Sequence, residues 1–104
     1  MFKNVYIEGV GSYHPKRIVS NEYYANHFKQ YGMEEHAIGL MEKVGRETRT
    51  LAETHETSVT MAVEASIKAL KNAKLDAKDI DATISVSDTP EYLTPCCALI
   101  IGSV

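Results

Sequence analysis

The composition of this 104-residue chain allows one folded domain at most and excludes several functional classes. Apolar residues make up 44% of the chain, enough for a modest core and too many for a disordered segment. Eleven Lys and Arg against fourteen Asp and Glu give a net charge of -3. A nucleic-acid partner is not expected, because binding to a phosphate backbone needs clustered cations. No stretch reaches the roughly 18 consecutive apolar residues of a membrane helix. We therefore expect a soluble, cytoplasmic protein with no membrane partner.

The first residues predict a strand over 4–10 followed by a turn at 11–15. Apolar and polar residues alternate up to Val10, and Gly9 and Gly11 permit a positive φ or a close approach of another backbone. The glycines do not indicate a phosphate loop, since no third glycine follows and no helix begins there.

Two short helices are expected next, over 22–30 and 34–44. Ser20 or Asn21 can cap the first helix, and Gly32 ends it. The second helix ends at Gly45. An extended polar segment over 46–52 follows. Together with Lys43 this segment holds a small group of cations, Lys43, Arg46 and Arg49. Composition alone favours a solvated connector, and the functional alternative is a small anion site for a phosphate or pyrophosphate.

The central prediction is an amphipathic helix over 57–73, a polar turn over 74–81 and a strand over 82–86. The apolar stripe of this helix is mostly Ala and Ser, which allows close packing on a flat partner such as a sheet. A helix, a turn and a strand in this order indicate an α/β fold.

The last residues predict a loop over 89–95 and a second apolar helix over 96–101. Thr94 can cap this helix and Pro95 can open it. The chain stops at Val104 with no polar tail. A domain that ended here would usually finish at an exposed polar segment, so the sequence suggests truncation inside or just after this helix.

The cysteines and histidines do not form a recognisable metal or catalytic cluster. Cys96 and Cys97 are adjacent, so a mutual disulfide would be strained, and no second pair exists to complete a zinc site. Both cysteines are expected to be structural, in a reduced intracellular protein. The four histidines are scattered and are expected at surfaces or interfaces; they are His14, His27, His36 and His55.

Taken in order, these pieces resemble the N-terminal portion of the β-ketoacyl-acyl-carrier-protein synthase III family of thiolase-like condensing enzymes. VYIEGVGSYHP at 5–15 is similar to the family's opening strand and G-x-G-x-x-x-P turn, and VSNE at 19–22 to its T-N-x-x-L helix entry. GRETR at 45–49 resembles G-I-R-E-R, and 57–73 resembles the S-x-M-A-x-x-A-x-x-A-L helix. Residues 89–102 are similar to the loop and helix that lead toward the nucleophile.

The resemblance implies a layered thiolase-like fold with a mixed sheet and packed helices, of which 1–104 would be a partial N-terminal domain, in a homodimeric enzyme. It implies decarboxylative condensation of an acyl thioester with malonyl-carrier protein, in fatty-acid or related acyl-chain biosynthesis. Coenzyme A or acyl-carrier-protein thioesters would be substrates, with no tightly bound cofactor and no metal. The nucleophilic Cys and the catalytic His and Asn would lie beyond Val104, so the 104 residues alone are expected to be inactive.

The donor site implied by the resemblance consists of Lys43 and Arg49. Family members often stack the adenine of coenzyme A on the Trp of a W-x-x-x-R segment, whose positions here read Gly39 and Lys43. The chain has no Trp. Lys43 can meet a phosphate only as a point charge, which leaves the donor open between coenzyme A and another acyl thioester.

Two other functions remain open. One is a non-catalytic interaction or dimerisation module. The other is a different thiolase-like enzyme, of the hydroxymethylglutaryl-CoA synthase or polyketide synthase type.

Overall fold

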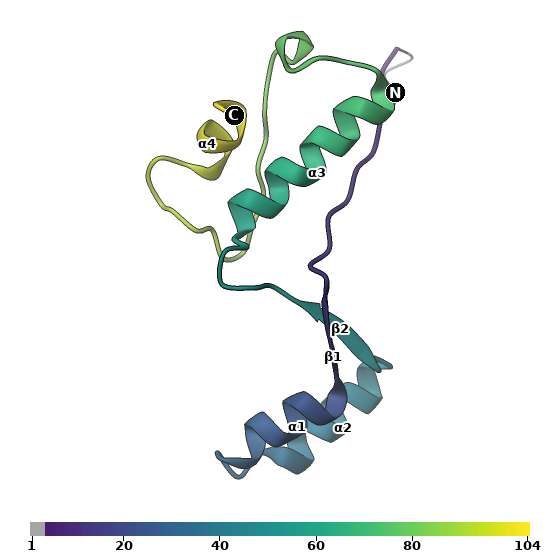
Figure 1. The fold of residues 1–104 in the computed structure, drawn as a ribbon, viewed down its shortest axis with the longest axis vertical. Coiled ribbons are helices and arrows are strands. Elements are labelled where there is room, and N and C mark those ends of the chain that lie inside the picture. Colours follow the sequence, from purple (N-terminus) through teal and green to yellow (C-terminus); the bar gives the residue numbers. More distant parts are fainter. Residues whose placement is uncertain (1–3) are drawn as a thin grey trace. The chain divides into compact units, whose positions relative to one another are not determined.

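The computed structural model describes residues 4–104, which form two compact units (Figure 1). Unit 1 consists of residues 4–14 together with 56–104, and unit 2 of residues 15–55. The α/β class is confirmed: helices accompany one small sheet, which has two antiparallel strands within residues 4–104.

Unit 2 is a two-stranded ribbon with a pair of helices between its strands. β1 (Arg17–Ser20) pairs with β2 (Thr48–Leu51), Arg17 lying opposite Leu51 and Ser20 opposite Thr48. Between them, α1 (Asn21–Lys29) and α2 (Glu34–Val44) pack against each other. The buried residues of this unit are Val19, Ala25 and Met41, one from β1 and one from each helix. The core of unit 2 is therefore the inner face of the helix pair and one side of β1.

Both helices of unit 2 lie where the sequence predicts them. α2 ends at Gly45, which has a φ of 69° and donates its N–H to the carbonyl of Glu42. This left-handed conformation favours glycine and closes the helix locally. Ser20 is the N-terminal cap residue of α1 by its extended backbone, although its side chain makes no capping hydrogen bond. The pairing of β1 with β2 was not predicted.

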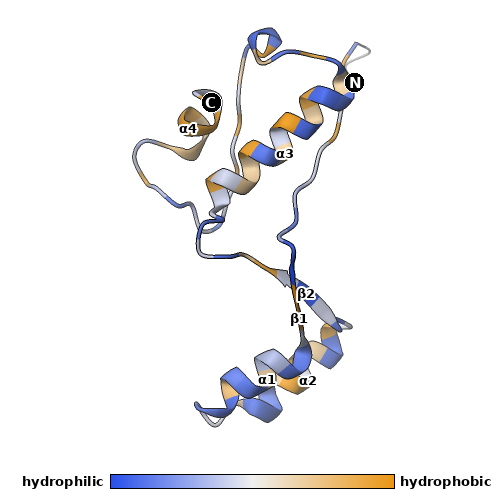
Figure 2. Ribbon diagram, in the orientation of Figure 1, coloured by the Kyte–Doolittle hydropathy of each residue, from blue (hydrophilic) through white to orange (hydrophobic). Residues whose placement is uncertain are grey.

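Unit 1 is organised around α3 (Ser58–Ala73), whose surface alternates between apolar and polar residues (Figure 2). Thr57 and Thr60 form a capping box at its N-terminus, and Lys74 ends it with a left-handed φ of 58°. Val59 is buried on the inner face. The predicted helix over 57–73 is therefore confirmed.

One neighbour of α3, besides α4, is an extended segment, where the sequence predicts a sheet. Asn72 Nδ2 donates to the carbonyl of Val10 (2.8 Å), and Lys68 Nζ donates to that of Ser12 (3.1 Å). Gly9 lies so close that an added Cβ would be 2.6 Å from the carbonyl oxygen of Ala69. The small residues of α3 thus permit the predicted close packing, here against a single extended segment.

Three sequence predictions in unit 1 need correction. Residues 4–10 and 82–86 are extended but are not strands, because neither segment is paired with another strand within residues 4–104. The 3₁₀ turn Ala77–Asp79 separates α3 from the second of these segments. The last helix is α4 (Cys97–Gly102), with Cys96 as its cap residue. Thr94 and Pro95 precede it, so the predicted cap is two residues early.

The contact of the glycines with α3 generates a stability prediction. We expect Gly11→Ala to lower the free energy of unfolding by about 1–3 kcal/mol, because its Cβ would overlap the Ala65 carbonyl and lie 2.5 Å from the Ala69 nitrogen. Gly39→Ala is the matched control. Nothing lies within 4 Å of a Cβ there, so it should stabilise α2 by about 0.5–1 kcal/mol. Urea unfolding followed by circular dichroism measures both, and equal effects would contradict the close approach.

Candidate functional site

The cation cluster predicted from the sequence lies in unit 2, at the end of α2 and along β2. Lys43 is in the last turn of α2, Arg46 follows the cap glycine, and Arg49 lies within β2. Lys43 and Arg46 are exposed, and Arg49 is half-buried. The chain therefore brings the three cations into one unit, in different surroundings.

The guanidinium of Arg49 points into unit 2. It stacks on the ring of Tyr24 from α1, with 4.4 Å between its carbon and the ring centroid. Its Nη2 donates to Asn21 Oδ1 (2.6 Å), and its Nη1 lies 3.3 Å from the sulfur of Met41 in α2. Its Nε is buried and has no hydrogen-bond partner within residues 4–104. Arg49 thus connects β2 to both helices.

Asn21 is a residue whose part in this site the sequence did not reveal. Its side chain accepts from Arg49 through Oδ1 and donates through Nδ2 to the carbonyl of Arg46. Its backbone N–H donates to the carbonyl of Glu47 (3.2 Å). The only signal in the sequence was its position at the start of a helix, which indicates a cap and gives no sign of these distant partners.

The exposed cations have the chemistry of an anion site. Within residues 4–104 the side chains of Lys43 and Arg46 make no hydrogen bond or ion pair, so their donors are open to a ligand. Lys29, by comparison, lies 3.8 Å from Glu34 in an ion pair. Lys43 can therefore meet a phosphate as a point charge, and Arg46 can offer a planar fork.

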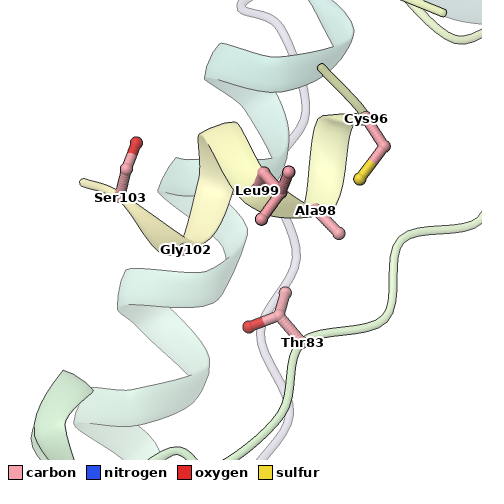
Figure 3. A pocket seen from close by; sticks show the side chains of 6 residues that line it. All are labelled: Thr83, Cys96, Ala98, Leu99, Gly102 and Ser103. Carbon is pink, nitrogen blue, oxygen red and sulfur yellow. The ribbon is translucent and has the colours of Figure 1, made fainter. Parts of the chain in front are cut away.

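The cysteines lie at the start of α4 in unit 1. Cys97 is buried and Cys96 is exposed. Cys96 borders an open hollow of about 410 Å³, in which Thr83 lies across from Ala98 and Leu99 (Figure 3). No histidine contributes to the lining of this hollow or of the second one beside Cys97. Neither thiol thus has a histidine base beside it in the part of the chain that the structure describes.

Other polar contacts of unit 1 hold the N-terminal end of α3. The hydroxyl of Thr57 and the N–H of Val59, 3.4 Å from the carboxylate, lower the pKa of Glu91 by stabilising its charged form. Tyr13 donates to the carboxylate of Glu56, which raises the pKa of the Tyr13 hydroxyl. These groups secure the N-terminal end of the helix and do not form a catalytic set.

The structure places all four predicted surface histidines in exposed positions, and the ring of His27 contacts those of Phe28 and Tyr31. No group of three metal-ligating side chains occurs among residues 4–104. Within the same residues, each helix is too short or too polar to span a bilayer.

Comparison with curated sequences finds relatives along nearly the whole chain. A β-ketoacyl-[acyl-carrier-protein] synthase III from Ehrlichia canis is 34% identical over 101 residues, which are 97% of this chain and 30% of the relative. One from Bartonella tribocorum is 37% identical over 93 residues, 89% of this chain and 27% of the relative. No protein-family model matches. The chain thus spans about 30% of the length of the curated relatives it matches.

Solved structures give the same result for the fold. The priming β-ketosynthase of the R1128 polyketide pathway matches with a TM-score of 0.76 and 29% identity, covering 93% of this chain and 28% of that one. These agreements in sequence and in fold extend over the same large share of the chain. The chain is therefore similar to β-ketoacyl-acyl-carrier-protein synthase III sequences over nearly its whole length, and it matches less than a third of the length of these relatives.

Proposed function

We propose that this sequence is the N-terminal part of a homodimeric, cytoplasmic acyltransferase that condenses an acyl thioester with malonyl-carrier protein. The observation that carries the proposal is the 34% identity to a β-ketoacyl-[acyl-carrier-protein] synthase III over 97% of the chain. The 104 residues then correspond to a partial thiolase-like domain, and the nucleophile, its base and the oxyanion donors come from elsewhere in the enzyme. The enzyme uses acyl thioesters of coenzyme A or carrier protein as substrates and needs no tightly bound cofactor.

A second candidate is priming in polyketide biosynthesis. The likeness to the R1128 priming β-ketosynthase favours it, and so does Gly39 at the position where the adenine-stacking Trp is expected. The two candidates share the chemistry of condensation and differ in the acyl donor.

The test is product analysis of the protein encoded by the complete reading frame. Incubation with malonyl-carrier protein and a series of acyl thioesters should yield a 3-oxoacyl product and CO₂, detected by mass spectrometry. The 104-residue chain alone should give none. Absence of product with every donor, although the protein is folded, would favour a non-catalytic module.

We propose that Lys43 contacts a phosphate of the acyl donor and that Arg49 borders the same site. The contact supplied by an exposed lysine is worth on the order of 1 kcal/mol, or about fivefold in affinity. Lys43→Ala in the complete enzyme should therefore raise KM for the donor about fivefold and leave kcat nearly unchanged. Lys29→Ala, which removes an exposed cation from α1, is the control and should leave KM as it is. Equal KM values in all three proteins would favour the solvated connector.

Both cysteines should be dispensable for catalysis. Cys96 is exposed and should be alkylated readily, whereas buried Cys97 should react slowly, because access limits its thiol. Cys96→Ala should retain full condensing activity. Rapid labelling of either residue, combined with loss of activity in its Ala variant, would contradict a structural role; peptide mass spectrometry with activity assays measures both.

The 104-residue chain by itself should associate. Ile84, Val86 and Leu93 are each about 90% exposed, and Leu99 is two-thirds exposed. Burying each such side chain contributes roughly 1.5–3 kcal/mol, which favours self-association through these residues. Size exclusion with light scattering at tens of micromolar should show dimers or larger species. A monodisperse monomer that binds no hydrophobic dye would contradict this expectation.

A further inference from the structure

The turn that joins α2 to β2 is held by one residue of α1, through its side chain and its backbone. Asn21 binds two consecutive carbonyls of this turn: its Nδ2 donates to that of Arg46 and its backbone N–H to that of Glu47. The turn's own hydrogen bonds run back into α2, from Gly45 to Glu42 and from Arg46 to Met41. Asn21 is thus the connection of this turn to α1.

Arg49 fixes the orientation of the Asn21 amide. Its Nη2 can only donate, so the atom facing it must be the oxygen of the amide. The amide nitrogen then faces the carbonyl of Arg46, which can only accept. If the amide rotated by half a turn, donor would face donor and acceptor would face acceptor. The Arg49 guanidinium therefore selects the one amide orientation that can hold the turn.

Arg49 is itself held on several sides. The Tyr24 ring lies under its guanidinium, Met41 is beside Nη1, and the buried Nε has no hydrogen-bond partner among the described residues. A guanidinium used in this way has little freedom to reach outward to a ligand. Of the three cations, Lys43 in the last turn of α2 and Arg46 in the turn between α2 and β2 are the exposed ones.

We propose that Arg49 and Asn21 are positioning residues for the acyl-donor site: Arg49 orients Asn21, and Asn21 holds the turn that contains Arg46 and directly follows the end of α2 with Lys43. Lys43 and Arg46 reach the donor phosphate from there. This inference rests on the proposed function, because it assigns the two residues a role in binding the same donor. It assigns direct phosphate contact to Lys43 and Arg46, and an indirect role to Arg49.

Two variants separate these roles. One keeps the positive charge at position 49, and the other keeps the acceptor oxygen at position 21 but removes the amide donor. Arg49→Lys retains a cation but has one terminal nitrogen, which cannot serve Asn21, Met41 and Tyr24 together. Asn21→Asp still accepts from Arg49 but has lost the donor to the Arg46 carbonyl. Arg17→Lys is the matched control, because Arg17 also lies over a tyrosine, Tyr23 at 5.4 Å, and is on the exposed side of the same unit.

The structural readout is amide hydrogen exchange in the complete enzyme. The N–H of Asn21, bonded to Glu47, should exchange about tenfold faster in Arg49→Lys and in Asn21→Asp, a change typical of losing one side-chain hydrogen bond. The amides of α3 should be unaffected, which separates a local change from loss of overall stability. Arg17→Lys should not alter exchange at Asn21. Unchanged exchange at Asn21 in both variants would overturn the inference.

The functional readout is a double-mutant cycle on KM for the acyl donor. Arg49→Lys should raise KM by severalfold with kcat unchanged. Because it acts through Lys43, adding it to Lys43→Ala should raise KM by much less than the product of the two single effects. Full additivity would mean that Arg49 meets the phosphate directly, which overturns the positioning role.

Failure of the proposed function gives a different pattern. If KM stays constant in Lys43→Ala, in Arg49→Lys and in the double variant while exchange at Asn21 still rises, the turn is held as described but does not bind the donor. That result overturns both the donor site and the positioning role for it.

Discussion

The half-buried guanidinium of Arg49 is the group on which the arrangement of residues 15–55 depends. It lies where β2, α1 and α2 meet and offers each of them a different contact: an aromatic face at Tyr24, an amide oxygen at Asn21 and a sulfur at Met41. A hydrocarbon side chain could fill this space but could not orient an amide. Placing a charge here has a cost, visible in the Nε, which is buried and has no hydrogen-bond partner among residues 4–104. The cost is acceptable because the guanidinium is weakly hydrated and stacks well on an aromatic ring.

In unit 1 the corresponding constraint is steric. The extended segment containing Gly9 and Gly11 lies directly against the backbone of α3. This close approach is possible because the facing residues are alanines on the helix and glycines on the segment. Side chains from α3 then bond the exposed carbonyls of the segment, Asn72 to Val10 and Lys68 to Ser12. The same face of α3 therefore provides both the close packing and the hydrogen bonds to the backbone carbonyls of the segment.

The parts of the fold that could be predicted are those determined by local chemistry. α2 and α3 lie as expected because Gly45 and Thr57 mark their ends through their own backbone or side-chain geometry. Strands depend on distant partners. Residues 4–10 and 82–86 therefore have the sequence pattern of strands, yet no strand among residues 4–104 pairs with them, whereas the pairing of β1 with β2 was not predicted. The candidate site divides in the same way. Its cations were visible in the sequence, but the inward direction of Arg49 and the role of Asn21 depend on contacts across 25 to 28 positions.

The antiparallel ribbon of unit 2 has an evolutionary consequence. Because Arg17 pairs with Leu51, the first residue of β1 and the last residue of β2 are adjacent. Tyr13 and Glu56, which flank this segment in the sequence, are joined by a hydrogen bond. The segment from β1 to β2 thus resembles an insertion whose two ends lie next to each other. Segments whose ends are close together tolerate insertion, deletion or replacement of helices between those ends.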